Sequence, residues 1–356
     1  MHSVPGSTEW RSGSLGKRLV IVGQAGGSNV GASLMRAAEI ELGTEATAFM
    51  DVSAANRGPA ALRALVWRLR DRRPLRQSAF VGSVIETCER ESPDYLISTG
   101  AVLTKASLIA LRRLGVATLN YSTDDPFNPT VRADWHLRAL PHFDIVATPR
   151  DNAGDLSSIG CRRVESVPFA FDESLIAVAE VPPAGPDVLF VGGADADRVA
   201  FLAEFAAGLP VAVVGGYWWR EQIPGVTDLG HQPPGPVAGL TAAAKVNLCL
   251  VRRANRDGHV MRTYEMAATG AAMVVEDTAD HRALFGAEGE AVLYFRTPLE
   301  AEAQARRLLA DEPLRLRLKA EAQRRILAGS NTYRDRLRTM IGFLGDTPAR
   351  RAAAIA

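Results

Sequence analysis

The chain has 356 residues, of which 47% are hydrophobic, and its formal net charge is +1. Domains cluster near roughly 100–150 residues, so this length and apolar content are enough for two hydrophobic cores. The near-zero charge excludes an overall electrostatic field that would draw the chain to nucleic acid or to an anionic membrane. We therefore expect no nucleic-acid partner.

The N-terminal segment, residues 1–16, is polar and lacks the apolar stretch of a secretion signal, so we expect it to be disordered. No apolar run approaches the roughly 20 residues that span a bilayer, and no transmembrane segment is expected. The three cysteines lie far apart in the sequence, which fits a reducing compartment and argues against a cysteine-based metal site. These features predict a cytoplasmic protein.

Strand and helix patterns alternate through the first half of the chain. Helices are predicted at 30–42 and within an arginine-rich region, 59–91, and further helix-length segments separate the later strands. Strands that are apolar on both faces and separated by helices are typical of a parallel sheet covered on both sides. We therefore predict a Rossmann-like domain over residues 17–180. Its strands are predicted at 19–23, 46–52, 95–99, 116–121, 144–148 and 164–169.

The connector "VPPAGP", residues 181–186, contains three prolines and a glycine and cannot continue a helix. The alternation restarts beyond it, which predicts a second Rossmann-like domain over residues 187–330. Residues 331–356 are predicted to form a C-terminal helix, with the option of crossing back onto the first domain, and a tail. The strands of the second half are predicted at 187–193, 210–216, 245–251, 272–276 and 291–295, and its charged helices at 298–309, 313–327 and 332–344.

Together these elements predict an α/β fold in which two doubly wound Rossmann-like domains face each other across a cleft. Ligands of open α/β sheets bind at the carboxyl ends of the strands. Closure of the two domains about the connector would expel water from the cleft. Site residues are therefore expected directly after the strands.

The segment "RRANRDGHVMRTYE", residues 252–265, follows the predicted strand 245–251 and leads into a helix that we expect to start near Val260. A helix N-terminus offers backbone N–H groups to a phosphate, and guanidinium groups beside it strengthen such a site. The guanidinium groups here belong to Arg252, Arg253, Arg256 and Arg262.

Glu265, which we place in the first turn of this helix, repels phosphate and is expected to accept hydrogen bonds from two neighbouring hydroxyl groups, such as those of a ribose. Asp257 would reach a second polyhydroxyl group on the other side of the phosphates. Carboxylate, cations and carboxylate in this order indicate a nucleotide linked to a sugar. In the alternative, Glu265 merely complements the helix dipole and the arginines form solvated ion pairs.

The string "RTYEMAATGAAMVVE", residues 262–276, resembles the nucleotide-binding segment of GT-B glycosyltransferases, in particular the glycosyltransferase-like group around the spore-maturation protein CgeB. The likeness extends to "DVLFVGGADADR" in the second half and to "PDYLIST" and "LGVATLNYSTDDPF" in the first, and it covers most of the chain in the same order. The resemblance implies a metal-independent transferase that uses a nucleotide sugar as co-substrate and no cofactor.

By the same resemblance, Glu265 matches the glutamate that holds the donor ribose, and Asp257 matches the first acidic residue of the E-x7-E pair of retaining members. Arg198 matches the cation that meets the diphosphate, and Gly192 belongs to the glycine pair expected beside the donor. The chain departs from the pattern at Gly193, where many GT-B enzymes carry a cation, and in having aspartate as the first acid. The missing phosphate contact would come from Arg252, Arg256 or Arg262.

The glycine-rich loop "GQAGGSNVG", residues 23–31, follows the first strand, and Gly26 and Gly27 would let its backbone approach an acceptor or a diphosphate. Asp51 ends the second strand, where a dinucleotide-binding domain carries its acid. An NAD(P)-dependent oxidoreductase is therefore an alternative. The arginine loop and Glu265 argue against it, because hydride transfer would not use them. A tight strand-to-helix turn is the purely structural reading.

Two adjacent carboxylates, Asp124 and Asp125, follow the predicted strand 116–121. They suit the binding of an acceptor hydroxyl or, if the enzyme inverts, general-base catalysis. A cap for a helix near Trp135 is the structural alternative.

His231 in "GHQPP" is expected beside the nucleobase, with a surface loop as the alternative. For Trp218 and Trp219, packing is favoured over stacking on a sugar.

The sequence thus predicts a glycosyltransferase of the hexosyltransferase type that moves a sugar from a nucleoside-diphosphate sugar, carrying UDP, GDP or dTDP, to an unidentified acceptor. Retention of the anomeric configuration is favoured, and the acceptor is a glycan, a lipid, a small molecule or a protein. Two alternatives stay open: an NAD(P)-dependent oxidoreductase, and a non-catalytic nucleotide-sugar-binding protein, which the absent cation at Gly193 permits.

Overall fold

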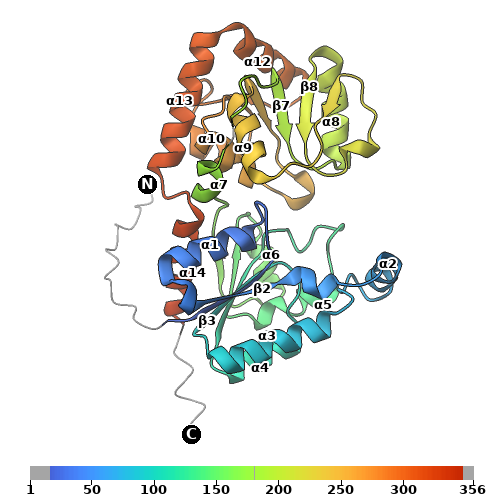
Figure 1. Cartoon of the computed structure of the whole chain (residues 1–356), viewed down its shortest axis with the longest axis vertical. Helices are drawn as coiled ribbons and strands as arrows, with labels where there is room; N and C mark the ends of the chain where they lie inside the picture. The colour runs from blue at the N-terminus through green and yellow to red at the C-terminus, as the bar shows by residue number, and fades with distance from the viewer. Residues whose placement is uncertain (1–16, 180, 348–356) are drawn as a thin grey trace.

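The computed structural model describes residues 17–179 and 181–347. The segment 1–16, predicted to be disordered, and the last residues of the predicted tail lie outside the described residues. The described chain forms two α/β domains, one above the other along the long axis of the molecule (Figure 1).

The first domain contains a parallel sheet of six strands in the order β2-β1-β3-β4-β5-β6. Its strands are β1 (Leu19–Gly23), β2 (Thr47–Asp51), β3 (Tyr95–Thr99), β4 (Ala117–Tyr121), β5 (Ile145–Thr148) and β6 (Val164–Ser166). Its α-helices are α1 (Val30–Leu42), α2 (Ala60–Leu69), α3 (Gln77–Glu91), α4 (Lys105–Arg113), α5 (Asp134–Leu137), α6 (Ala153–Ser158) and α7 (Glu173–Ala177). Short 3-10 turns are η1 (Thr44–Ala46), η2 (Val52–Asn56) and η3 (Leu140–His142).

The second domain repeats the design, with a parallel sheet in the order β12-β11-β10-β7-β8-β9. Its strands are β7 (Val188–Val191), β8 (Val211–Val214), β9 (Val226–Asp228), β10 (Val246–Cys249), β11 (Met273–Glu276) and β12 (Leu293–Phe295). Its helices are α8 (Ala196–Gly208), α9 (Pro234–Ala243), α10 (Met261–Ala268), α11 (Ala279–Phe285), α12 (Pro298–Ala310) and α13 (Glu312–Ala328). Its 3-10 turns are η4 (Trp218–Arg220) and η5 (Arg253–Asn255). The last helix, α14 (Tyr333–Gly345), returns to the first domain.

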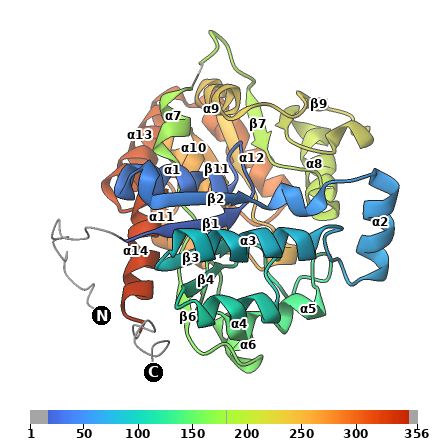
Figure 2. The same ribbon diagram turned by 60° about the horizontal axis from the view of Figure 1, so that its bottom comes forward.

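Burial explains why these apolar runs form central strands. Every residue of β1, β3, β7, β8, β10 and β11 is buried, because helices cover both faces of each sheet. In the first domain α1 and α14 cover one face, while α3 and α4 cover the other (Figures 1 and 2). The predicted fold class, two doubly wound parallel α/β domains, is confirmed.

Three local predictions differ from the structure. The arginine-rich region divides into α2 and α3, because Asp71 and Arg72 adopt left-handed backbone angles and Pro74 follows them. Strand β9 was not predicted, since it is short and largely exposed. Helix α10 begins at Met261, so Glu265 stands in its second turn and the prediction of the first turn was wrong.

The two domains are joined at more than one point. After α7 the chain passes into β7, and after α13 it returns, so that α14 packs against α1, β4 and β5 of the first domain (Figure 1). Beside this return, Phe171 accepts a hydrogen bond from the amide of Tyr333 at 3.1 Å and donates one to Asn331 at 3.0 Å. One hydrophobic cluster runs from the first domain through these residues into the second.

Within the described ranges, no helix combines the length and the apolar character needed to cross a membrane.

Candidate functional site

A cavity between the domains, here called the central cavity, opens at the carboxyl ends of β7 and β10. These two strands are neighbours at the point where the strand order of the second sheet reverses, which is where open α/β sheets bind ligands. The first domain closes the cavity with residues that follow β4 and β5. The charged side chains and the glycine that line it are Asp124, Arg150, Gly192, Arg198, Arg252, Asp257 and Arg262.

The loop between β10 and α10, residues 250–260, is held in place from within its own domain by Glu276. This carboxylate ends β11 and accepts a hydrogen bond from the amide of Val251 at 3.0 Å. It also receives both Nε and Nη2 of Arg253, at 3.3 and 3.0 Å. A charge-assisted pair of this kind locks the start of the loop at the strand edge. Arg253 therefore points away from the central cavity.

The same loop is docked onto the first domain. The side-chain amide of Asn128 donates a hydrogen bond from Nδ2 to Oδ1 of Asn255 at 2.7 Å. Nδ2 of Asn255 in turn donates to Oδ1 of Asp124 at 3.1 Å. Arg256 binds buried Asp125 through Nε at 2.5 Å and Asp155 through Nη1 at 2.6 Å. Arg256 and Asp125, predicted as a phosphate ligand and as a possible base, thus form an interdomain bridge.

Asp125 also accepts a hydrogen bond from the amide of Phe127 at 3.1 Å, an Asx turn that ends β4's loop. The alternative of a cap for the helix near Trp135 is wrong, because α5 has Ala133 at its N-cap and Asp125 makes this turn well before it. Asp124 has an exposed side chain and borders the central cavity. The two adjacent carboxylates consequently have different surroundings.

A buried ion pair joins the domains beside these contacts. Nε of Arg150 lies 2.6 Å from Oδ1 of Asp257, and both side chains are almost wholly inaccessible. Arg150 also donates to the carbonyl oxygens of Ser122 and Thr123, at 3.0 and 2.7 Å. Burial raises the pKa of Asp257, and the nearby Arg150 opposes that rise. Asp257 is therefore a lining residue whose carboxylate is already paired with a cation.

The N-terminus of α10 points into the central cavity, which Val260, Met261 and Arg262 line. Thr263 fixes it, because Oγ1 accepts a hydrogen bond from the amide of Val260 at 3.1 Å. Behind Thr263, buried His281 contacts the same hydroxyl at 2.9 Å and the carbonyl oxygen of Glu276 at 2.8 Å. Burial lowers the pKa of His281 to about 4, so the ring is neutral at pH 7.

Arg198 lies in the first turn of α8, beneath the central cavity. Its Nη1 donates to the carbonyl oxygen of Gly193 at 3.3 Å, and Asp195 is 3.5 Å away. Nε is buried and meets no hydrogen-bond acceptor among residues 17–179 and 181–347. Burial lowers the pKa of Arg198, which Asp195 opposes. A largely buried guanidinium with a donor to spare is suited to an anion in the cavity.

Gly192 supports this region by its size. A Cβ at this position would come within 2.8 Å of the ring of Phe190 and 3.5 Å of Arg198. Its carbonyl oxygen accepts a hydrogen bond from the indole of Trp218 at 2.7 Å. Trp218 is buried, in agreement with packing, whereas Trp219 is 72% exposed and does not pack.

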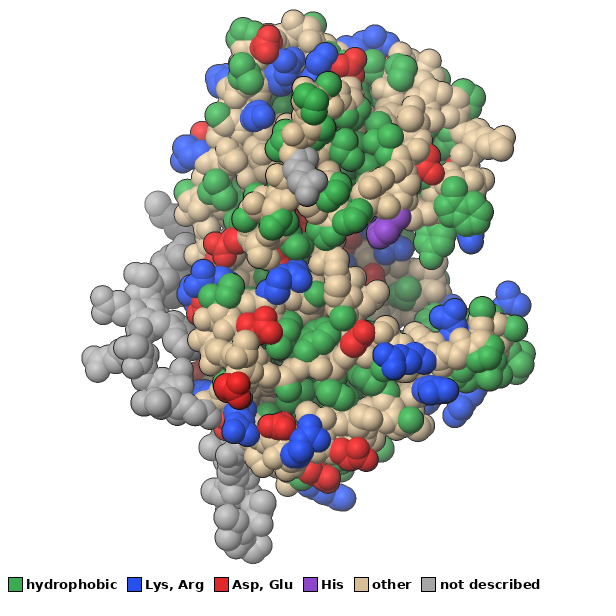
Figure 3. Space-filling model, viewed as in Figure 1, with side chains coloured by type: hydrophobic (Ala, Val, Ile, Leu, Met, Phe, Trp, Pro, Cys, Tyr) green, Lys and Arg blue, Asp and Glu red, His purple; other side chains and the backbone are tan. Residues whose placement is uncertain are grey.

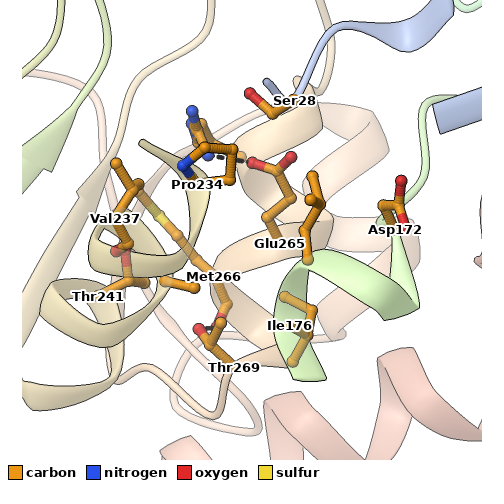
Figure 4. A pocket seen from close by; sticks show the side chains of 12 residues that line it. Ser28, Asp172, Ile176, Pro234, Val237, Thr241, Glu265, Met266 and Thr269 are labelled. Carbon is orange, nitrogen blue, oxygen red and sulfur yellow. Dashed lines mark hydrogen bonds and ion pairs between the residues drawn. The ribbon is translucent and has the colours of Figure 1, made fainter. Parts of the chain in front are cut away.

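Glu265 lies in a smaller pocket next to the central cavity, here called the Glu265 pocket, and Arg262 lines both (Figure 4). Its carboxylate is paired with the guanidinium of Arg262. In Figure 4 the carboxylate points toward Ser28 of the first domain, so it faces the gap between the domains. Burial raises the pKa of Glu265, against the effect of Arg262. Apolar residues of α7 and α9 form the rest of the wall: Leu175, Ile176, Pro234, Val237 and Ala238.

A further cavity, the first-domain cavity, adjoins the central cavity and shares Thr123, Asp124, Phe169 and Met261 with it. The glycine-rich loop contributes Gln24, Ser28 and Asn29. Gly26 and Gly27 have left-handed φ angles of 76° and 59° and are exposed, but they do not line the cavity. They shape the turn that brings their neighbours to the edge.

The carboxylate of Asp51 is hydrogen-bonded to this turn. Its carboxylate accepts hydrogen bonds from the amides of Ala25, at 3.2 Å, and Ser53, at 2.9 Å. Partial burial raises its pKa, but these bonds and the hydroxyl of Ser53 outweigh that effect and lower it. The acid that a dinucleotide would need is thus engaged in holding its own loop.

The remaining predicted residues are spread around the cavity. Arg252 lies on its rim, with loose ion pairs to Asp124 at 3.6 Å and Asp195 at 3.8 Å. His231 is exposed in the loop before α9 and lines none of the three cavities described above. The structure thus gathers Asp124, Arg198, Arg252, Asp257 and Arg262 around one space, with Glu265 beside it.

Sequence reasoning missed four residues that shape the site: Arg150, Asn255, His259 and Glu276. Arg150 follows β5 directly, at the sheet edge where site residues were expected, and this position was an available signal. Nε2 of His259 accepts a hydrogen bond from the backbone amide of Phe169 at 3.2 Å. Nδ1 therefore carries the hydrogen and donates a hydrogen bond to Asp280 at 2.8 Å. Nothing local in the sequence indicates that contact.

Across residues 17–179 and 181–347, no group of three or more His, Cys, Asp or Glu side chains is arranged to hold a metal ion.

Comparison with known proteins found a family match within the second domain. Residues 198–342 match a family model described as "Glycosyl transferase-like". No curated protein sequence matches this chain.

Solved structures of similar fold cover nearly the whole chain. Sucrose-phosphate synthase from Thermosynechococcus elongatus has a TM-score of 0.64 at 13% identity, with 96% of this chain and 100% of that chain covered. The trehalose 6-phosphate synthase from Burkholderia multivorans has a TM-score of 0.61 at 13% identity, with the same shares covered. Anabaena HepE in complex with UDP-glucose has a TM-score of 0.61 at 14% identity, with 92% of this chain and 99% of that chain covered. The chain therefore has the GT-B glycosyltransferase fold, with a glycosyl transferase-like second domain.

Proposed function

We propose that the protein is a glycosyltransferase that moves a hexosyl group from a nucleoside-diphosphate sugar to an acceptor bound on the first domain. The observation that carries this proposal is the grouping of three features in two adjoining cavities: Arg198 with its buried Nε and the N-terminus of α10 in the central cavity, and the carboxylate of Glu265 in the pocket next to it. The match over residues 198–342 to a glycosyl transferase-like family supports it, as does the resemblance to the CgeB-like group.

The diphosphate would lie in the central cavity. As the bond between the anomeric carbon and the diphosphate breaks, negative charge develops on the leaving phosphate, and preorganised donors stabilise it. Arg198 and the amides at the start of α10 are such donors, and Arg252 and Arg262 add charge at the rim. Because Gly193 carries no side chain to help, these arginines replace the missing cation. We propose that they also make a metal ion unnecessary.

The nucleoside would lie in the Glu265 pocket. Glu265 would accept hydrogen bonds from the two ribose hydroxyls, while Arg262, which now pairs with it, would turn toward the diphosphate that it also borders. The apolar wall formed by α7 and α9 offers a surface for the base. UDP is the first nucleotide to test, since HepE of similar fold is in complex with UDP-glucose.

The acceptor would enter through the first-domain cavity, where Asp124 faces both spaces. The acceptor oxygen forms the new bond to the anomeric carbon as the bond from that carbon to the diphosphate breaks, and the acceptor proton passes to the leaving diphosphate oxygen. We propose retention, because Asp125 is committed to Arg256 and Asp257 to Arg150, and Asp124 is held by Asn255. None of these is poised as a strong base on the far side of the sugar.

A donor screen tests the proposal directly. Purified protein is incubated with UDP-glucose, GDP-mannose and dTDP-glucose, and release of the nucleoside diphosphate is followed with and without EDTA. We expect release from one donor that EDTA leaves unchanged, and anomeric analysis of the product should show retention. Inversion, with turnover lost in Asp124→Asn, would overturn the stereochemical part.

The same screen separates the alternatives. Thermal stabilisation by a nucleotide sugar without any turnover, under conditions that include candidate acceptors, would indicate a binding protein. Stabilisation by NAD(H) or NADP(H), with none by UDP, GDP or dTDP, would indicate an oxidoreductase and would end the proposal.

A further inference from the structure

Helix α2 stands apart from the rest of the first domain, and none of its residues is buried. It carries several large apolar side chains that are nonetheless exposed: Leu62 at 45%, Leu65 at 53%, Trp67 at 42% and Leu69 at 74%. In Figure 3 hydrophobic side chains gather on this projection, surrounded by Lys and Arg. A cluster of this kind on a projecting helix marks an interaction surface.

Four apolar residues of α2 form a stripe, while Trp67 lies on the opposite side of the helix. Leu62, Leu65, Val66 and Leu69 follow the spacing of one helix face, and Arg63 and Arg68 lie on either side of it. Such a helix, apolar on one face and bordered by arginines, fits the boundary between water and the acyl chains of a membrane.

The charge around α2 is concentrated. Residues 57–76 contain seven arginines and one acid, Asp71, in a chain whose formal net charge is +1. No carboxylate in the described ranges lies within ion-pair distance of Arg63, Arg68, Arg70 or Arg76. Their positive charge is thus available to an anionic partner.

A hollow at the corner between α2 and α3 adds a second observation. It is lined by Arg70, Arg73 and Arg76 and by the first residues of α3, Gln77, Ser78 and Ala79. Three guanidinium groups around a helix N-terminus suit a phosphate group.

The corner is joined to the end of α2, where the amide of Arg72 donates to the carbonyl oxygen of Trp67 at 2.8 Å, and it is anchored on the rest of the first domain. The guanidinium of Arg73 stacks over the ring of Trp135 at 5.0 Å, and Trp135 donates its indole hydrogen to the carbonyl oxygen of Asp71 at 2.8 Å. Arg72 donates to the carbonyl oxygen of Pro129 at 2.8 Å. The stripe and the hollow are therefore presented together from a fixed base.

From these contacts we propose that α2 and the hollow beside it form a docking surface for an anionic lipid bilayer. The leucine stripe enters the interface, the bordering arginines meet the headgroups, and the hollow receives a lipid phosphate. A nucleic acid would have no use for the leucines. A second copy in a two-fold contact would bring two sets of the same arginines together.

The position of α2 gives the docking a direction. Turn η2, which precedes α2, lines the first-domain cavity through Val52, and α2 projects at the level of the gap between the domains (Figure 1). A bilayer bound to α2 would therefore lie near the entrance to the acceptor side. The docking itself is independent of the reaction proposed above.

Flotation with lipid vesicles tests this surface. The full chain is mixed with vesicles of equal parts phosphatidylglycerol and phosphatidylcholine, and with vesicles of phosphatidylcholine alone. We expect it to float with the anionic vesicles and to be released by salt. The double variant Leu65→Glu, Leu69→Glu should bind at least about tenfold more weakly, because it loses apolar insertion and adds two negative charges.

The matched control is Leu316→Glu, Leu327→Glu on α13, where the two leucines are 52% and 53% exposed and arginines flank the first. It should bind as the unaltered chain does. Equal binding by the two double variants, equal flotation with neutral vesicles, or self-association that only the α2 variant abolishes would each overturn the proposal. Nucleotide-sugar binding, measured on the same samples, reports separately on the donor site and on folding.

Discussion

The glycine-rich loop after β1 and the arginine loop after β10 both follow a central strand of their sheet, yet they are built differently. The first is exposed at residues 24–27 and is held only from within its own domain, through Asn29 and through Asp51 at the end of β2. The second is held by Glu276 from behind and by ion pairs and amides of the first domain in front. The donor side is thus preorganised, whereas the acceptor side is left open to adapt.

The largest effect should come from breaking the buried pair that holds the arginine loop. Arg150→Ala leaves Asp257 buried and unpaired, and we expect the free energy of unfolding to fall by about 3–5 kcal/mol. Urea denaturation measures it. The control is Arg132→Ala, whose pair with Asp134 is exposed on both sides, so that the loss should stay below about 1 kcal/mol. Similar losses in both variants would contradict the view of a clamped loop.

The pH dependence of the free energy of unfolding tests buried His281, which lies behind the arginine loop. The pKa of His281 falls from 6.5 to about 4 on burial, so the unfolded chain takes up protons below pH 6.5 while the folded chain stays neutral. Stability is complete at neutral pH and falls as the pH drops from 6.5 to about 4, by about 3 kcal/mol for this group. His281→Gln should remove that part of the slope.

His136 provides the matched comparison in the first domain. It is also buried, which lowers its pKa to about 4, so His136→Gln should flatten the acid slope in the same way. Only His281→Gln should also weaken nucleotide-sugar binding, because only His281 supports Thr263 at the start of α10. Equal effects on binding would show that the start of α10 does not depend on this contact.

Glu265→Ala tests the donor side itself. We expect nucleotide affinity to weaken by about 1–3 kcal/mol through the loss of two charged hydrogen bonds to the ribose. Isothermal titration with UDP measures the change. Glu321→Ala removes a surface glutamate of α13 that is paired with Arg324 and Arg325, and it should leave affinity unaltered. Unchanged affinity in Glu265→Ala would remove the ribose assignment.

The smallest effect is expected in the open loop. Gly26→Ala places a side chain at a φ of 76°, where its Cβ meets nothing within 4 Å, so the cost should be about 1–2 kcal/mol of backbone strain. Gly289→Ala is the matched control, because Gly289 has the same φ of 76°, a Cβ there also meets nothing within 4 Å, and the residue lines none of the three cavities. Melting curves should shift equally, while acceptor-dependent turnover should change in Gly26→Ala alone.

Predictions from the sequence succeeded where the relevant residues are neighbours. The loop of residues 252–259, the helix after it and Glu265 were recognised together because strand, loop and helix signals follow one another. The placement of Glu265 in the first turn failed by one residue, since the helix begins at Met261 and its start is fixed by Thr263, which contacts His281. A boundary of that kind has no strong local signal.

The roles of individual charged residues were harder to predict from the sequence. Arg256 was predicted from the sequence as a phosphate ligand, but in the structure its guanidinium group forms ion pairs with Asp125 and Asp155. Whole-chain charge also concealed the basic cluster around α2, because acids elsewhere cancel it in the sum. An average over the chain removes the spatial separation that gives such a patch its effect.

The amino-acid sequence by itself determined the two sets of buried strands and the presence of cations and acids after the strands. These follow from apolar runs, prolines and glycines, which act on the chain over a few residues. Only the tertiary structure decided which arginines are neutralised and which face the cavity, because each ion pair joins segments that are distant in sequence and gains its strength from shared burial.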